Sequence, residues 1–240
     1  MHFLLLDSAD ARGSIAIFQD AKLLHVDPHP AGQDFSSWLL PSVERLLADS
    51  RLSLWNLDGY AVCSGPGSFT GLRVGLTTVK AWAEIYRKPI AAVSRMEALA
   101  AASSELVIPR QPFTAVFIDA RRNQIFAALY DESGVATESE AVIGIESFLC
   151  KAETICGKGA ILWKTPDSHL LEAMAAWPAR QAKGDALERI EPPFAAQLGS
   201  LAYQKFLSGK TTDSISLDAN YVRRSDAELF WKDHVSAVKA

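Results

Sequence analysis

The sequence Phe3–Phe18, FLLLDSADARGSIAIF, and the sequence Ala115–Tyr130, AVFIDARRNQIFAALY, share one pattern. In each, an apolar run ends in an aspartate, a polar turn follows, and a second apolar run returns. Both therefore predict a β-hairpin, and the repeat indicates two similar lobes, which we assign to residues 1–106 and 107–240. Two unrelated hairpins would give the same pattern, so the repeat by itself leaves coincidence open.

A glycine-rich loop joins a predicted strand to a predicted helix in the first lobe. The stretch Ala61–Leu76 reads AVCSGPGSFTGLRVGL, and the free N–H groups at a helix N-terminus attract anions. A phosphate-binding P-loop ends in Gly-Lys-Ser/Thr, and no lysine follows in the required place. The dinucleotide pattern fails because Thr70 stands where the third glycine belongs. Helix capping explains the hydroxyls of Ser68 and Thr70 better than nucleophilic catalysis does.

The helix predicted over Thr70–Tyr86 contains Gly71 and Gly75, which are four residues apart and therefore share a face. Each glycine costs about 1 kcal/mol relative to alanine inside a helix, so the pair needs a structural reason. A residue without Cβ lets another backbone come close. The pattern leaves open whether that backbone belongs to a partner subunit or to this chain.

Two further helix starts are visible in the first lobe. Apolar residues at helical spacing predict a helix over Phe35–Ala48, and Pro41 inside it predicts a kink or a late start. Ser94 and Glu97 have the spacing of a capping box, which predicts the beginning of another helix.

The composition is that of an ordinary globular protein. The chain has 240 residues, 49% of them hydrophobic, and a net charge of −4. A negative chain is unsuited to holding nucleic acid by itself, although contact with RNA inside a complex is compatible with it. The three cysteines match no zinc spacing and favour a reducing compartment.

No membrane segment and no metal site are predicted. The apolar run before Asp7 is too short for a signal peptide or a membrane span, so we expect a cytoplasmic protein. His25 and His29 have the spacing of a helical metal pair, but Pro28 lies between them and disfavours a helix.

A strand that ends in aspartate and turns into a hairpin, once in each lobe, is how actin-like and sugar-kinase-like ATPases hold phosphates and Mg²⁺. Asp7, Ser8 and Asp119 are the corresponding positions here. Hydroxyls are sparse in both turns, so we expect a degenerate nucleotide site with no catalytic residue, and an aspartate also caps turns without any ligand. An ATP-dependent phosphotransferase of the actin and sugar-kinase superfamily is the alternative function.

The run SGPGSFTGLRVGLTTVKAWA (64–83), followed by KPIAAVSRMEALA (88–100), resembles the signature of the bacterial tRNA threonylcarbamoyladenosine biosynthesis protein TsaB (YeaZ) family. The opening hairpin, the stretch 36–62 and DARRNQIFAALY (119–130) are similar too, so the resemblance covers most of the chain. It implies an α/β, two-lobed actin-like ATPase (ASKHA) fold, degenerate, in which a mixed sheet flanked by helices is duplicated.

The resemblance also implies a function and partners. It suggests a non-catalytic subunit required for N6-threonylcarbamoyladenosine modification of tRNA next to the anticodon. Such a subunit pairs with its catalytic homologue TsaD and works with the ATPase TsaE, and it binds tRNA through the complex or forms a homodimer when alone. No cofactor is expected on this chain alone, since the partner complex uses ATP and a divalent metal. Nothing in the residues supports the family's old peptidase-like labels.

In that family the subunits meet largely through first-lobe helices, which here are those predicted over Phe35–Ala48 and Thr70–Tyr86. Family members often carry His-Ser-Glu before the Leu-Leu-Pro of the first of these helices. This chain reads DFSSWLLP there, which puts a polar contact in doubt and makes the surface more apolar. The expected partner-binding residues are Leu39, Leu40, Val43, Leu47, Thr70, Gly71, Leu72, Arg73, Gly75, Leu76, Val79 and Lys80.

Overall fold

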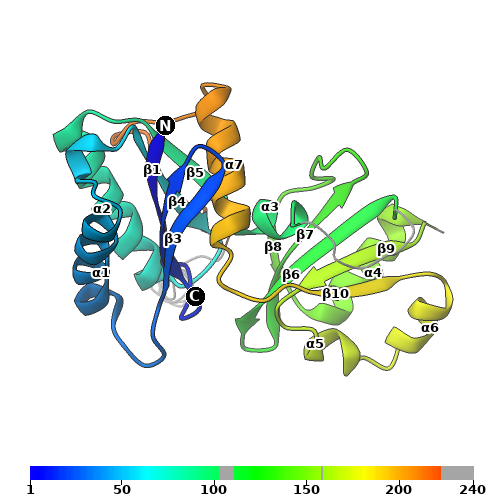
Figure 1. The fold of residues 1–240 in the computed structure, drawn as a ribbon. Coiled ribbons are helices and arrows are strands. Elements are labelled where there is room, and N and C mark those ends of the chain that lie inside the picture. The colour runs from blue at the N-terminus through cyan, green and yellow to red at the C-terminus, as the bar shows by residue number, and fades with distance from the viewer. Residues whose placement is uncertain (103–110, 158, 223–240) are drawn as a thin grey trace, which may run out of the picture.

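The computed structural model describes residues 1–102, 111–157 and 159–222, which form two lobes side by side (Figure 1). Each lobe is built on a five-stranded mixed sheet. The first sheet has the order β3-β2-β1-β4-β5, with β1 (His2–Asp7), β2 (Ser14–Gln19), β3 (Lys22–Pro28), β4 (Gly59–Gly65) and β5 (Ile90–Ser94). The second has the order β10-β9-β6-β7-β8, with β6 (Phe113–Arg121), β7 (Gln124–Asp131), β8 (Ala141–Ile143), β9 (Ile161–Thr165) and β10 (Ala186–Arg189).

The two sheets repeat one topology. The central strand β1 pairs antiparallel with β2 and parallel with β4. In the second lobe, β6 pairs antiparallel with β7 and parallel with β9. Asp7 and Asp119 lie at equivalent places near the ends of β1 and β6. The predicted internal duplication and α/β fold class are therefore confirmed.

Helices cover both faces of the first sheet, which explains why β1 and β4 are apolar almost throughout. On one side lie α1 (Phe35–Asp49), the short helix η1 (Leu54–Asn56) and α2 (Phe69–Tyr86), and on the other lies α7 (Ala195–Leu207) (Figure 1). Gly199 makes the close packing of α7 possible, because a Cβ there would stand 2.1 Å from the ring of Phe18.

The lobe boundary differs from the prediction in one respect. Residues 107–240 were assigned to the second lobe, but α7 packs on β5, β1 and β2 of the first sheet. Phe194, Leu198 and Leu217 belong to the first lobe's hydrophobic core. The first lobe is therefore made from both ends of the described chain, and the second lobe is inserted between them.

The second lobe has its own smaller core, on which Trp163 and Trp177 pack edge to face. Its helices are α4 (Ile145–Cys156), α5 (His169–Glu172) and α6 (Trp177–Ala182). Between the lobes lies α3 (Arg95–Ala100), which contacts β5 as well as β6, β7 and β9. Any displacement of one lobe against the other therefore acts on α3.

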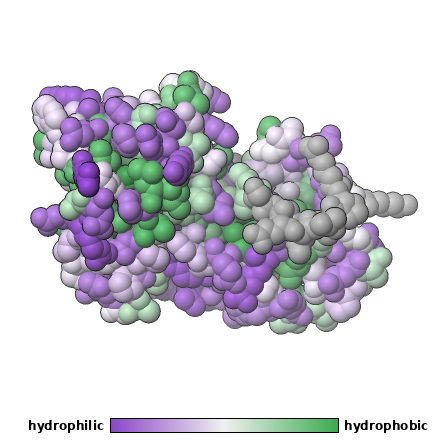
Figure 2. All heavy atoms as spheres, in the orientation of Figure 1, coloured by the Kyte–Doolittle hydropathy of each residue, from purple (hydrophilic) through white to green (hydrophobic). Residues whose placement is uncertain are grey.

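The predicted helix starts are largely confirmed. The α1 helix begins at Phe35 with Pro41 inside it, so a start delayed by the proline is wrong. Ser94 caps α3, since its Oγ accepts hydrogen bonds from the Met96 and Glu97 N–H groups. At the edge of the first sheet, β3 borders solvent, and Figure 2 shows a patch of hydrophobic surface on this lobe. Lys22 and Pro28 at the ends of β3 disfavour edge-to-edge pairing.

Candidate functional site

The cleft between the lobes is the place where the two aspartate-bearing hairpins face each other. Its volume is about 950 Å³, and it is lined by the turn after β1, the N-terminus of α2, the start of α3 and the β6–β7 turn. Asp7 is fully buried at the end of β1 and accepts a hydrogen bond from the Ala9 N–H at 3.0 Å. Asp10 shapes the same turn by accepting from the Arg12 N–H at 2.7 Å.

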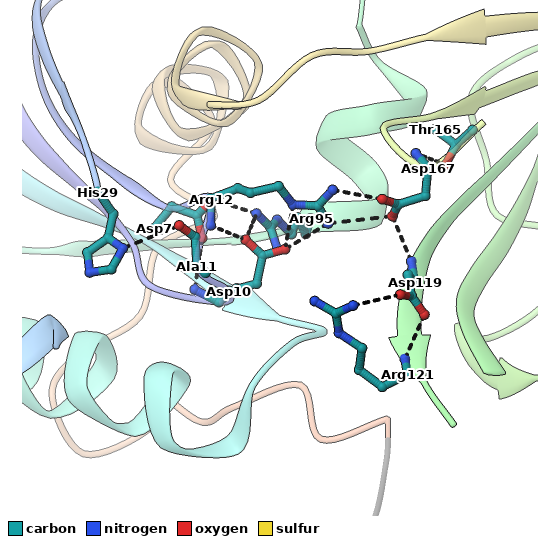
Figure 3. Close-up of polar contacts among 11 residues, drawn as sticks. Asp7, Asp10, Ala11, Arg12, His29, Arg95, Asp119, Arg121, Thr165 and Asp167 are labelled. Carbon is teal, nitrogen blue, oxygen red and sulfur yellow. Dashed lines mark hydrogen bonds and ion pairs between the residues drawn. The ribbon is translucent and has the colours of Figure 1, made fainter. Parts of the chain in front are cut away.

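Arg95 lies directly against the carboxylates of the first hairpin (Figure 3). Its Nη1 is 2.7 Å from Asp10 Oδ2, and its Nη2 is 3.5 Å from Asp7 Oδ2. The side chain is 1% exposed, and its guanidinium lies over the ring of Phe194. Arg95 thus occupies the space beside these carboxylates in which a divalent cation would have to bind.

The charges of this cluster shift the pKa values of its members. Burial would raise the pKa of Asp10, but the charges and hydrogen bonds of Arg95 and Arg12 hold that pKa well below its usual range. Burial raises the pKa of Asp7 above its usual value in spite of the nearby Arg95. Burial would lower the pKa of Arg95, but the two aspartates raise it, so Arg95 stays charged. A permanent cation is therefore built into the site.

Arg12 extends the cluster across the cleft to the second lobe. Its Nη1 is 2.8 Å from Asp167 Oδ1, while its Nη2 is 3.0 Å from Asp10 Oδ2. Asp167 also accepts from the Asp119 N–H at 2.8 Å, which ties the end of β6 to the same network (Figure 3). The two lobes are thus connected by a charged chain that runs from Asp10 through Arg12 to Asp167.

Asp119, the predicted counterpart of Asp7, is engaged by its own turn. Its carboxylate accepts from the Arg121 N–H at 2.8 Å and lies 3.2 Å from Arg121 Nη1. Arg121, Arg122 and Asn123 all have positive φ angles of 55–65°, so the turn between β6 and β7 consists of left-handed residues without a glycine. Both arginines of this turn are exposed.

The glycine-rich loop packs on the chain's own first hairpin. The Ser68 N–H donates to the Ala9 carbonyl at 2.6 Å, and a Cβ on Gly67 would lie 2.2 Å from that oxygen. A Cβ on Gly71 would lie 2.1 Å from the Ser8 carbonyl oxygen, and one on Gly75 would lie 2.3 Å from Ser8 Oγ. Ser8 Oγ in turn donates to the Gly71 carbonyl at 2.7 Å. The paired glycines therefore allow Ser8 of the same chain to pack closely against α2. The alternative, that they allow a partner's backbone to pack there, is wrong.

Most of the expected partner-binding residues are buried inside the chain. Leu40 is 58% exposed, Thr70 and Arg73 are also exposed, and Lys80 is half-buried, so these four can still meet a partner. The other residues predicted on these helices are not on the surface, so their prediction as partner contacts is wrong. They belong to the apolar stripes of the two helices that face the first sheet. The buried residues are Leu39, Val43, Leu47, Gly71, Leu72, Gly75, Leu76 and Val79.

The residues that dominate the cleft were not singled out from the sequence. Asp10 and Arg12 lie in the first turn, Asp167 follows β9, and Arg95 lies inside a capping box. Residues distant in sequence meet here, and the only local signal was the density of charge in DSADAR and in SRME. A long-range ion-pair cluster has no sequence period that would reveal it.

His25 and His29, the pair with metal-site spacing, take structural places. His25 lies in a strand, and the ring of His29 stacks on Phe35 and meets Trp38 edge to face, so the metal-pair spacing is accidental. In residues 1–102, 111–157 and 159–222, no three metal-ligating side chains come together. Within the same ranges, every helix is too short or too polar to serve as a membrane span.

The duplicated sheets and the paired hairpins around the cleft define a protein with a two-lobed, actin-like α/β fold. Residues 21–170 match the family model TsaD, described as tRNA N6-adenosine threonylcarbamoyltransferase. Over 95% of both chains, 25% of the residues are identical to those of the tRNA threonylcarbamoyladenosine biosynthesis protein TsaB of Haemophilus influenzae, and over 97% of both, 28% are identical to those of TsaB of Escherichia coli. The structure of YeaZ from Pseudomonas aeruginosa superposes with a TM-score of 0.69 at 24% identity, over 92% of this chain and 99% of that one.

The chain belongs to the family that the TsaD model describes, and over nearly its whole length it is similar to the tRNA threonylcarbamoyladenosine biosynthesis proteins TsaB. The resemblance seen in the glycine-rich run is thereby confirmed.

Proposed function

We propose that the chain is a non-catalytic subunit of tRNA N6-threonylcarbamoyladenosine biosynthesis, acting in the cytoplasm. It pairs with a TsaD-like catalytic subunit, works with a TsaE-like ATPase and meets tRNA through that complex. The main support for a non-catalytic role is the position of Arg95, whose guanidinium lies 2.7 Å from the Asp10 carboxylate and 3.5 Å from that of Asp7.

The cleft residues do not fit a bound Mg²⁺–ATP. A hard cation needs carboxylate oxygens that are open to it, but Arg95 and Arg12 already neutralise those of the first hairpin. To admit the metal, the ion pairs of the buried Arg95 with Asp7 and Asp10 would have to break, which is unfavourable by several kcal/mol. We therefore propose that ATP and its metal bind in the partner complex.

Titration calorimetry with Mg²⁺–ATP tests this reading against the phosphotransferase alternative. The purified chain is expected to release no binding heat, and the Asp7→Ala variant is expected to give the same result. Stoichiometric ATP binding that Asp7→Ala abolishes would establish the phosphotransferase reading instead.

The exposed part of the α1–α2 surface supports a partner-binding role. Leu40 on α1 is 58% exposed, and both helices lie on the side of the first lobe away from the second lobe (Figure 1). An uncovered apolar side chain of this size is a common feature of a binding surface. In the absence of its partner, the same surface would bring two copies of the chain together.

Co-purification with the TsaD-like subunit measures the contribution of this surface. Leu40→Glu is expected to reduce pairing while the thermal unfolding curve stays unchanged, because the side chain is largely in solvent. Leu207→Glu is the matched control, since Leu207 is 69% exposed but lies on α7. Full pairing of Leu40→Glu, or an equal loss in both variants, would contradict the assignment of this surface.

A further inference from the structure

The mouth of the inter-lobe cleft carries exposed aromatic and basic side chains. We define the cleft mouth as Phe69 and Tyr221 of the first lobe together with Arg121 and Arg122 of the second. All four line the cavity of about 950 Å³. A ligand held by all of them would touch both lobes at once.

Phe69 and Tyr221 form a ready platform for a flat ring. Their centroids are 5.2 Å apart, and their planes differ by 35°. Arg73 orders the pair, because its guanidinium lies 3.9 Å from the Phe69 centroid and its Nε donates to the Tyr221 hydroxyl at 3.3 Å. Phe69 remains 37% exposed and Tyr221 41% exposed. Aromatic side chains fixed in this way stack with unpaired nucleic-acid bases.

The second lobe supplies positive charge opposite this platform. Arg121 and Arg122 are exposed at the β6–β7 turn, and Figure 3 shows the Arg121 side chain directed toward the first lobe. The cavity is lined by four arginines and three aspartates, although the whole chain has a net charge of −4.

The other large cavity between the lobes has the opposite character. It is lined by five aspartates and glutamates and by two lysines, so it repels anions. The cleft that holds the exposed aromatic pair has one arginine more than it has aspartates, whereas the other cavity has three more acidic residues than lysines, and this difference together with the aromatic pair distinguishes the cleft.

We propose that the cleft mouth binds single-stranded RNA. A base stacks on Phe69 and Tyr221, and a neighbouring phosphate lies against Arg121 and Arg122. This inference rests on the proposed role in tRNA modification and adds a direct RNA contact by this chain to it. Duplex RNA is unsuitable, because its bases are already stacked on one another, whereas the bases of a loop can turn outward. The net negative charge keeps the contact weak, so it assists a partner's binding and does not replace it.

Fluorescence anisotropy at low ionic strength tests the proposal. The probe is a labelled single-stranded oligoribonucleotide, and a duplex of the same sequence and free ATP serve as separate competitors. Phe69→Ala and the double variant Arg121→Gln/Arg122→Gln are each expected to weaken RNA binding about tenfold. Loss of the two arginines also lowers the salt dependence of binding, since fewer phosphates are neutralised.

Arg189→Gln is the matched control. Arg189 is an exposed arginine at the end of β10, outside the cleft lining, and it forms an ion pair with Glu191. It is expected to bind RNA as the unaltered chain does. Thermal unfolding shows whether each variant is folded.

Three outcomes would overturn the RNA site: no binding by the unaltered chain, an equal loss in the control, or competition by ATP as effective as that of the single strand. Co-purification of the same variants with the TsaD-like subunit separates the two proposals. Intact pairing together with unaffected RNA binding would end this inference and leave the proposed function in place.

Discussion

Arg12 and Asp167 face each other across the cleft with 2.8 Å between Nη1 and Oδ1, and they join the two lobes through side chains alone. The Asp167 side chain is 11% exposed, so this ion pair is better shielded from water than a surface pair. Because Asp167 also accepts a hydrogen bond from the Asp119 N–H, the Arg12–Asp167 ion pair fixes the end of β6 relative to the first hairpin. The cleft is therefore held at one width by charge as well as by packing.

A double-mutant cycle measures this connection. Arg12→Gln, Asp167→Asn and their combination are expected to give a coupling free energy of about 1–3 kcal/mol in urea unfolding, because the groups are close and partly buried. The exposed Arg189–Glu191 pair provides the control cycle and is expected to give at most about 0.5 kcal/mol. Equal coupling in both cycles would show that Arg12 does not join the lobes.

Removal of the buried cation should be the most damaging single change in the cleft. Arg95→Met is expected to lower the free energy of unfolding by about 3–5 kcal/mol at neutral pH, since Asp7 and Asp10 lose their counter-charge. Arg87→Met is the control, because the Arg87 side chain is 80% exposed and its loss is expected to cost no more than about 0.5 kcal/mol. The measurement is urea unfolding followed by circular dichroism.

The effect of Arg95→Met should depend on pH in a defined direction. In the folded chain the pKa of Asp10 lies below its ordinary value of 3.8, so its pairing stabilises the protein above that pH and is lost as the pH falls. The stability difference between the unaltered chain and Arg95→Met is therefore expected to shrink as the pH falls through 3.8. A difference that stays constant would mean that the methionine acts through packing alone.

The packing of Gly75 on Ser8 predicts a reversal of sign. Gly75→Ala is expected to lower the free energy of unfolding by about 1–2 kcal/mol, because the new Cβ stands 2.3 Å from Ser8 Oγ. In a Ser8→Ala background that oxygen is gone and the Ser8 Cβ lies at 3.5 Å, so the same change should be neutral or stabilising through helix propensity. Thermal unfolding of the unaltered chain, the two single variants and the double variant measures this reversal. Additive effects of the two substitutions would contradict the contact between Gly75 and Ser8.

Glu140 provides a second pH test, on the opposite side of α3. It accepts hydrogen bonds from Ser94 Oγ and, at 2.6 Å, from Asn220 Nδ2. Burial raises its pKa above the ordinary 4.5, although these hydrogen bonds act to lower it. The protonated carboxyl is therefore favoured in the folded chain, and the stability of the unaltered protein relative to Glu140→Gln is expected to fall as the pH rises above 4.5.

Asp213→Asn is the control of opposite sign for that experiment. Asp213 accepts from the Ser216 N–H at 2.7 Å, and this hydrogen bond holds the pKa of its carboxyl below 3.8. Here the unaltered chain should gain stability over the variant as the pH rises through 3.8. Urea unfolding over a pH series measures both, and slopes of the same sign would refute the assignment for Glu140.

The sequence predicted the local features of this protein well. The apolar runs ending in Asp7 and Asp119 were assigned to strands, and Ser94 to a helix cap, because period and capping chemistry act over a few residues. The target of the paired glycines was missed, because spacing shows that Gly71 and Gly75 share a face but not what faces them. Ser8, which is 63 residues from Gly71 in the chain, is the answer.

The cleft cluster and the place of α7 were missed for the same reason. Arg95 and Asp10 are separated by 85 residues, and a charged side chain in a capping sequence gives no sign that it will be buried. The α7 helix has an apolar face that could pack on either sheet. Only the tertiary fit, such as that of Gly199 on the Phe18 ring, directs it to the first lobe.

The return of α7 to the first sheet also determines the order in which the protein can form on the ribosome. Translation delivers β1 to β5 first, yet one face of their sheet stays uncovered until residues 195–207 have left the exit tunnel. The inserted lobe, in contrast, is complete in itself once β10 has emerged. Although it is encoded second, it is the part that can finish folding first, and the nascent first lobe is the part that needs protection from aggregation in the meantime.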